Sequence, residues 1–129
     1  GLYGDFYGDF VRRGAQFMAI ISNDGWWGDT PGYKHLFTIS RLRAIEHRRA
    51  IARSANTGMS GFISARGDIG ETLGWEKRGV ISAAVPLNSE LTFYTRYGDY
   101  LGRIAEYLTL LCVLYYIAYR VKKKNYLVK

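Results

Sequence analysis

A run of thirteen uncharged residues, Tyr107–Tyr119, leaves the C-terminal part of this sequence few ways to fold. Thirteen is short for a membrane span, which needs about twenty apolar residues, and runs of this length more often form buried core helices. Counted from Leu101, however, the segment is long enough to span a bilayer if Arg103 snorkels and Glu106 lies near the interface.

The residues around this run favour a membrane over a protein core. Tyrosines resembling interfacial aromatic belts stand at its two ends, at Tyr97, Tyr100, Tyr107, Tyr115, Tyr116 and Tyr119. A basic cluster of the positive-inside type follows at once, with Arg120, Lys122, Lys123 and Lys124. We therefore predict a transmembrane helix over residues 97–120 and a basic cytoplasmic tail over residues 121–129.

Cys112 is the only cysteine, so neither an intrachain disulfide nor a cysteine-rich metal site is expected. Because it lies inside the apolar helix, we expect a small buried thiol there and not a nucleophile. We predict no bound metal and no cofactor.

The net charge narrows the range of partners. Eighteen Lys and Arg residues against eleven Asp and Glu give a formal charge of +7, which fits nucleic acid, an anionic lipid surface or acidic substrates. The basic residues concentrate in Arg41–Arg53 and Arg120–Lys129, and the aromatic residues do not interleave with them as base-stacking platforms would. We expect a membrane and no nucleic acid; the sequence predicts no oligomeric state.

Residues 1–96 alternate helix and strand signals. A short helix is predicted from Asp9 to Phe17, then a strand over Phe17–Ile21. A long helix should start at Asp29-Thr30-Pro31, with an apolar stripe at Leu36, Ile39, Leu42 and Ile45. Further strands are predicted over Ala50–Ala55, Met59–Ser64, Gly70–Leu73 and Val80–Val85. This order predicts a domain of α/β or α+β type.

Two adjacent tryptophans follow the first predicted strand. Ser22-Asn23-Asp24-Gly25 is turn chemistry, so Trp26 and Trp27 should lie just past the strand end. In open α/β architectures ligands usually bind at that edge. The alternative is that both indoles pack in the domain core.

Four motifs in order resemble the bacterial apolipoprotein N-acyltransferases, which are membrane members of the nitrilase superfamily. They are Ile21–Gly28, Lys34-His35-Leu36, Arg43-Ala44-Ile45-Glu46 and Arg53–Gly58. The resemblance runs from about Tyr7 to the basic tail. It implies that residues 1–96 are the C-terminal portion of a nitrilase-like α-β-β-α sandwich, placed on the periplasmic side of the bacterial inner membrane and followed by one transmembrane helix.

The resemblance also implies a reaction. A cysteine thiolate, helped by a glutamate base and an oxyanion lysine, takes an acyl chain from a phospholipid as a thioester and passes it to the N-terminal amine of a lipoprotein cysteine. In the register that aligns Tyr7 to Gly14, however, Leu2-Tyr3-Gly4 occupies the positions of the family's Cys-Tyr-Glu. The base and the lysine lie still earlier. We therefore expect no catalytic residue in this chain, a C-terminal fragment that is inert by itself.

Pocket and supporting residues are what the chain retains by this resemblance. Substrate-pocket candidates are Trp26, Trp27, Tyr3 and His35, the last with a structural hydrogen-bonding role as its alternative. Supporting roles are expected for Asn23, Asp24, Glu46, Arg53 and Asn56, with Glu46 paired to Arg49 or Arg53. Two other functions stay open: part of a soluble carbon-nitrogen hydrolase, or a membrane-anchored binding module that catalyses nothing.

Overall fold

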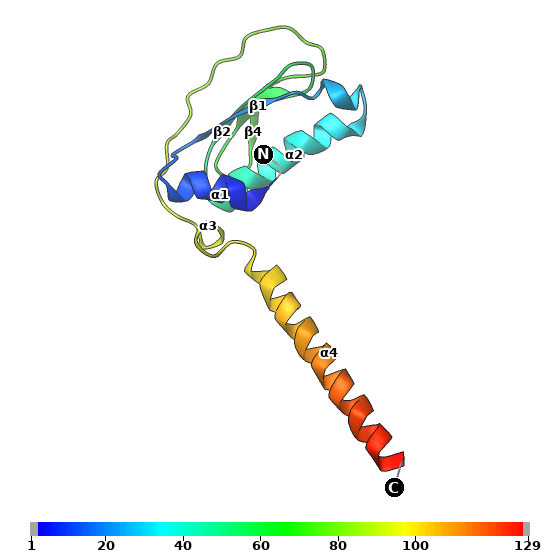
Figure 1. Cartoon of the computed structure of the whole chain (residues 1–129). Helices are drawn as coiled ribbons and strands as arrows, with labels where there is room; N and C mark the ends of the chain where they lie inside the picture. Colours follow the sequence, from blue (N-terminus) through cyan, green and yellow to red (C-terminus); the bar gives the residue numbers. More distant parts are fainter. Residues whose placement is uncertain (1–2, 128–129) are drawn as a thin grey trace. The chain divides into compact units, whose positions relative to one another are not determined.

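The computed structural model describes residues 3–127, and the chain divides into two compact units, Gly1–Gly98 and Asp99–Lys129. The first unit contains a four-stranded sheet of strands in the order β1 (Met18–Ser22), β2 (Ile51–Ala55), β3 (Ser60–Ile63) and β4 (Ile69–Leu73) (Figure 1). Strand β1 is parallel to β2, and the other neighbours are antiparallel. An α/β domain followed by an apolar helix, as predicted, is confirmed.

The parallel pair is connected by the long helix α2 (Pro31–His47), which makes a β-α-β unit. Ser22 stands opposite Ala55 in the register, so the loops that follow β1 and β2 leave the sheet at the same edge. The strands predicted over Phe17–Ile21 and Ala50–Ala55 are confirmed to within one residue, and the long helix begins at Pro31 as predicted.

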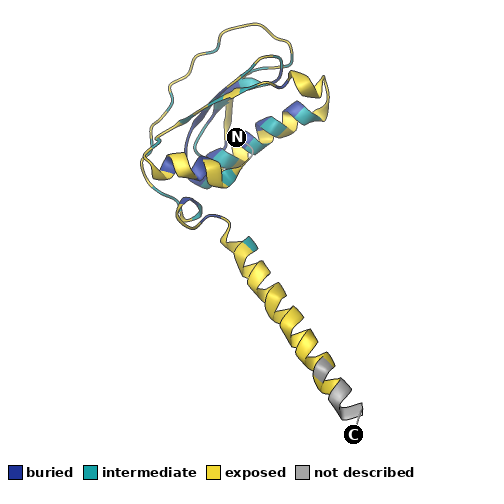
Figure 2. Cartoon of the chain, in the orientation of Figure 1, coloured by how far each residue is buried: buried dark blue, intermediate teal, exposed yellow. Residues whose placement is uncertain are grey.

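Helices α1 (Gly4–Arg12) and α2 cover one face of the sheet (Figure 1). Strand β2 alternates as a half-covered strand should, with Ile51 and Arg53 buried and Ser54 exposed. The core between helices and sheet, dark blue in Figure 2, consists of Tyr7, Val11, Phe37, Ala44, Ile51 and Ile63.

Helix α2 begins as predicted but buries a different face. The Thr30 hydroxyl accepts a hydrogen bond from the Gly32 N–H at 3.2 Å, and Pro31 is the first helical residue. The predicted stripe is wrong at its C-terminal end, since Leu42 and Ile45 are 45% and 37% exposed. Residues spaced by three drift around a helix of 3.6 residues per turn, so the buried face follows mixed spacings of three and four instead: Tyr33, Phe37, Ser40, Ala44 and His47.

Two further predictions differ from the structure. Helix α1 begins at Gly4 and ends at Arg12, five residues before the predicted end, and the chain then turns at Gly14 with φ +99°. Residues 80–85 form no strand, because no neighbouring strand pairs with them and Val80 is 96% exposed. Val80 and Ile81 instead line a groove of about 390 Å³ over the second face of the sheet, beside Phe62.

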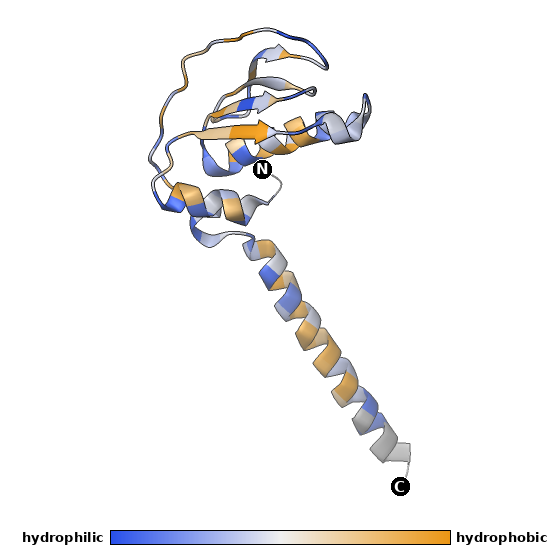
Figure 3. Cartoon of the chain, turned by 45° about the horizontal axis from the view of Figure 1, so that its top comes forward, coloured by the Kyte–Doolittle hydropathy of each residue, from blue (hydrophilic) through white to orange (hydrophobic). Residues whose placement is uncertain are grey.

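Helix α3 (Phe93–Tyr97) closes the first unit, and α4 (Tyr100–Leu127) forms the second. Within α4, the 21 residues Tyr100–Arg120 are long and apolar enough to cross a membrane, and none of that window is buried within the chain. Figure 3 shows the apolar stretch in the middle of α4. Cys112 is exposed on this helix within the chain, so the predicted burial of its thiol, which assumes a surrounding membrane, stays a prediction.

Candidate functional site

The loop after β1, Asn23–Gly28, carries both indoles and is named the tryptophan turn. Gly25–Trp27 forms a single 3₁₀ turn, in which the Trp27 N–H donates to the Asp24 carbonyl at 3.1 Å. Gly28 follows at φ +57°, a backbone conformation that favours glycine, and directs the chain into the Thr30 cap of α2. The predicted position of Trp26 and Trp27 past the end of a strand is confirmed.

A buried ion pair anchors this turn to the sheet. Asp24 is completely buried, and Arg53 of β2 donates to both of its carboxylate oxygens, from Nη2 to Oδ1 at 2.9 Å and from Nη1 to Oδ2 at 3.0 Å. The same guanidinium donates to the Met59 carbonyl. Gly58 allows the approach, since a Cβ at that position would lie 2.1 Å from Asp24 Oδ2. Arg53 therefore ties the loop after β1 to the turn between β2 and β3.

The side chains of two asparagines also hold the tryptophan turn, through hydrogen bonds at the same edge of the sheet. Asn56 Oδ1 accepts hydrogen bonds from the backbone N–H groups of Asp24 and Thr57, both at 2.9 Å. Asn56 Nδ2 donates at 2.7 Å to Asn23 Oδ1, which also accepts from the Gly25 N–H at 3.3 Å. Both side chains are thus occupied with holding the turn, as the sequence predicts.

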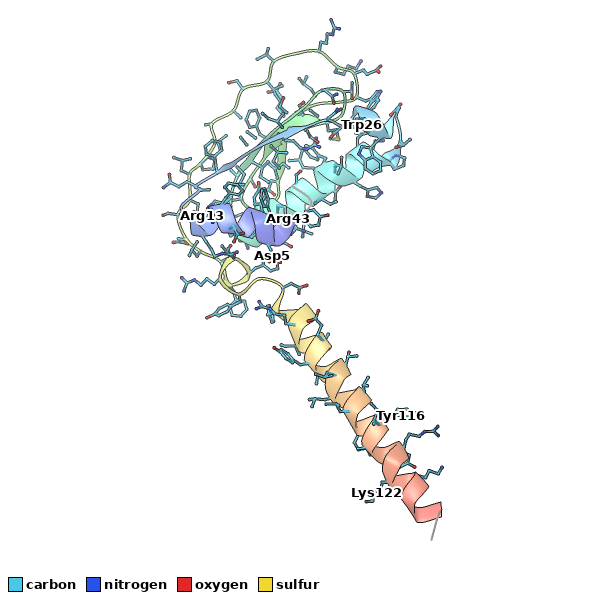
Figure 4. All side chains as sticks on the ribbon, in the orientation of Figure 1. Asp5, Arg13, Trp26, Arg43, Tyr116 and Lys122 are labelled. Carbon is cyan, nitrogen blue, oxygen red and sulfur yellow. The ribbon has the colours of Figure 1, made fainter. Side chains whose placement is uncertain are left out.

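The two tryptophans of the turn have different surroundings, and neither is packed in the core. Trp26 is 86% exposed, at the N-terminal end of α2 and far along this helix from Arg43 (Figure 4). Trp27 is half exposed and lies against Gly32, where an added Cβ would come within 2.6 Å of the indole. Trp27 also lines a cavity of about 260 Å³ between β1, β2 and α2, together with Ile20, Ser22, Asn23, Leu36, Ile39, Ser40 and Arg53.

The other two pocket candidates are also exposed. His35 lies on α2 one turn after Gly32, hence near Trp27. Tyr3 is 77% exposed and precedes Gly4, which lies against Arg43. Gly32 and Arg43 are eleven residues apart in α2, about 16 Å along its axis, so the structure does not bring Tyr3 to the tryptophan turn. Leu2, aligned by sequence with the family's nucleophile, lies outside the described residues.

The prediction of the partner of Glu46 is wrong. Glu46 Oε2 accepts from Arg43 Nη1 at 2.5 Å, an i,i+3 pair within α2. Arg53 is committed to Asp24, and Arg49 donates to main-chain carbonyls, among them Ala15 at 2.7 Å. Helix α2 ends at His47, so the chain has left the helix before Arg49 and Arg53, and neither follows Glu46 on a helical face.

A second polar cluster, around His47, was not predicted. The His47 ring is 1% exposed, stacks on Tyr7 with ring centroids 5.5 Å apart, and its Nδ1 lies 2.9 Å from Thr95 Oγ1. Burial lowers the pKa of His47 to about 4, assisted by the positive charges of Arg43, Arg12 and Arg49 and opposed by a backbone hydrogen bond to Gly4. The i,i+3 spacing of Ala44 and His47 could have indicated that the ring is buried.

Metal ligation finds no support in the part of the chain that the structure describes. No three His, Cys, Asp or Glu side chains gather there at a spacing that would hold an ion. The tryptophan turn itself offers apolar contact and the indole N–H donors of Trp26 and Trp27.

Residues 2–91 match the model of the carbon-nitrogen hydrolase family. Because this match covers more than half of the chain, the chain belongs to that family.

Within the family, the chain is similar to bacterial proteins named apolipoprotein N-acyltransferase. The one from Chlorobaculum tepidum is 48% identical over 90 residues, 70% of this chain and 17% of the relative. The one from Rhizobium meliloti is 43% identical over 78 residues, 60% of this chain and 15% of the relative. The one from Bradyrhizobium diazoefficiens is 38% identical over 123 residues, 95% of this chain and 22% of the relative. The chain thus spans about a fifth of these relatives or less.

Proposed function

We propose that this chain is part of an N-acyltransferase that moves an acyl chain from a phospholipid to the N-terminal amine of a lipoprotein cysteine. The observation that carries the proposal is the match to the Bradyrhizobium diazoefficiens relative, which extends over 95% of the chain and so includes most of α4. A soluble carbon-nitrogen hydrolase has no use for an apolar helix of 21 residues at this position.

The proposed chemistry proceeds in two acyl transfers. A cysteine thiolate attacks the ester carbonyl of the phospholipid, the acyl–oxygen bond breaks, and the departing alkoxide takes a proton as lysophospholipid. The lipoprotein amine then attacks the thioester, an amide forms, and the thiolate is released while a base takes the amine proton. A lysine stabilises the oxyanion in both steps. By the resemblance, the glutamate base and this lysine belong to a part of the protein before Tyr3. The family's thiol position falls at Leu2 of this chain, so the thiol of the proposed reaction must come from outside this segment.

The residues of this chain contribute the surroundings of that reaction. Trp27, over its cavity of about 260 Å³, forms an apolar wall for an acyl or glycerophospholipid group, together with Leu36 and Ile39. His35, exposed one turn after Gly32 on α2, is a further candidate for contact with the substrate. Asp24, Arg53, Asn23 and Asn56 hold this wall in place. We assign residues 1–96 to the catalytic domain on the periplasmic side of the inner membrane, 97–120 to a transmembrane helix and 121–129 to a cytoplasmic tail.

An acyl-transfer assay on the longer protein that carries this segment tests the proposal. With phospholipid vesicles and a diacylglyceryl-cysteine peptide, we expect the peptide to gain the mass of one acyl chain and an acyl-thioester to be trapped on the enzyme when the peptide is withheld. The 129-residue chain alone should trap none. Release of ammonia from simple amides without acyl transfer would favour the hydrolase, and neither activity would favour a binding module.

A further inference from the structure

Trp26 and Trp27 are neighbours in sequence but differ in what they touch. Trp27 rests on Gly32 and lines a cavity, so its indole has a place inside the first unit. Trp26 is 86% exposed and lines none of the cavities described above. A tryptophan buries more apolar surface than almost any other residue when a core takes it in, so an indole left this exposed forgoes a large stabilisation.

The exposure of Trp26 is built into the turn. Its neighbours Asp24 and Trp27 are fixed by the ion pair to Arg53, by the Asn56 amide and by the 3.1 Å bond that closes the 3₁₀ turn. On the C-terminal side of the turn, the Thr30 hydroxyl donates to the Trp27 carbonyl at 2.7 Å. With anchors on both sides, the backbone of Trp26 cannot rotate the indole inward without breaking buried bonds.

The surroundings of Trp26 fit a phospholipid interface better than a charged partner. An indole has an apolar body and one N–H donor, which places tryptophan at the boundary between acyl chains and headgroups. The exposed charges on the following segment are mixed, Asp29 being acidic and Lys34 basic, with His35 beside them. Mixed charge gives little attraction to a strongly charged surface and leaves the indole as the dominant contact.

We propose that Trp26 is an interfacial anchor, which the Asp24–Arg53 pair holds outward so that it enters the headgroup region of a phospholipid bilayer, while Trp27 faces the substrate cavity. This rests on the proposed function, which puts the chain at a membrane. The partner is the bilayer itself, distinct from the phospholipid molecule that donates its acyl chain.

Lipid quenching of tryptophan fluorescence tests this assignment on the whole chain. The sequence has three tryptophans, so Trp27→Phe with Trp75→Phe leaves Trp26 as the only indole. In vesicles of phosphatidylcholine brominated near the headgroup end of its acyl chains, we expect the Trp26 emission to fall by about half relative to unbrominated vesicles. The matched control retains only Trp75, which is packed on the Tyr33 ring at 4.9 Å and should lose much less. Circular dichroism checks that both variants fold.

Cys112 separates this inference from the proposed function, because it is the only thiol and lies in α4. Protection of Cys112 from a membrane-impermeant maleimide reports that α4 is inserted. Quenched Trp26 supports the anchor, whether or not Cys112 is protected. Unquenched Trp26 with protected Cys112 overturns the anchor alone and indicates a protein contact for this indole. Unquenched Trp26 with labelled Cys112 overturns both the anchor and the membrane span.

Discussion

Arg53 reaches three separate segments from one position in β2. Its guanidinium pairs with Asp24 of the tryptophan turn, donates to the Met59 carbonyl before β3, and lies 6.0 Å from the centroid of the Phe37 ring on α2. A buried charge pair of this kind adds little net stability compared with an apolar replacement, because both ions lose their hydration. Its benefit is a single geometry for the turn.

Removing one partner of this pair should therefore lower the free energy of unfolding far more than replacing both partners with apolar residues. We expect Asp24→Ala to lower the free energy of unfolding by about 3–5 kcal/mol, since it strands the Arg53 charge in the interior. The double variant Asp24→Leu with Arg53→Met should recover most of that loss. Denaturant unfolding of the chain in detergent, followed by circular dichroism, measures both values.

An exposed arginine provides the control for this comparison. Arg13 is exposed, and Arg13→Met should change the free energy of unfolding by less than about 0.5 kcal/mol. A double variant as unstable as Asp24→Ala would mean that the turn depends on polar contacts and not on relief of a stranded charge.

The structural roles of single residues could be predicted from the sequence where their hydrogen-bond partners are close in sequence. Asn23 and Asp24 stand in an Asx-rich turn, and their role in holding the loop follows from that chemistry alone. The partner of Arg53 was not predictable in the same way. Asp24 precedes it by 29 residues, and the two meet only because β1 and β2 pair in parallel with Ser22 opposite Ala55.

Helix α2 is the element that joins the two polar sites of the first unit. Its first turn supports Trp27 through Gly32, and its last turn places His47 between Tyr7 of α1 and Thr95 of α3. The pattern of apolar residues alone did not predict which face of α2 is buried, since that face includes Ser40 and His47 and leaves Leu42 exposed. Tertiary packing determines that face: Phe37 lies against Arg53 of β2, and His47 lies against Tyr7 of α1 and Thr95 of α3. These contacts are distant in sequence.

The buried His47 predicts a pH dependence of stability. Its pKa is lowered from 6.5 to about 4, because burial penalises the cation and Arg43, Arg12 and Arg49 repel it. The unfolded chain therefore takes up this proton first as the pH falls, and stability declines from about pH 6.5 down to about pH 4, by about 3 kcal/mol in total. His47→Gln, which does not titrate, should remove that part of the decline in unfolding experiments between pH 4 and pH 7.

The second histidine supplies the comparison. His35→Gln makes the same substitution at an exposed position of α2 and should leave the free energy of unfolding nearly unchanged. If His47→Gln were equally without effect, the acid sensitivity of the first unit would have to come from its carboxylates.

At the scale of the whole molecule, the chain combines a domain that buries its core with a helix that buries nothing. Every residue of Tyr100–Arg120 faces outward within the chain, apart from partial cover at Gly102, although the segment is the most apolar long stretch of the sequence. The sequence could predict this helix because composition and length are enough to identify a candidate span. What composition does not supply is the identity of whatever covers the helix, since no described part of the chain does so.

Two arginines placed in the middle of α4 test whether lipid covers the helix. Each arginine at the centre of a spanning helix costs about 2.5–3.5 kcal/mol for insertion, so Leu110→Arg with Leu114→Arg should move the chain from the carbonate-resistant membrane pellet to the supernatant. Val80→Arg places one such arginine at a 96% exposed apolar residue of the first unit and should leave the chain in the pellet. Retention of the double variant in the membrane would show that α4 is covered by protein, because a protein surface can offer counter-charges that acyl chains cannot.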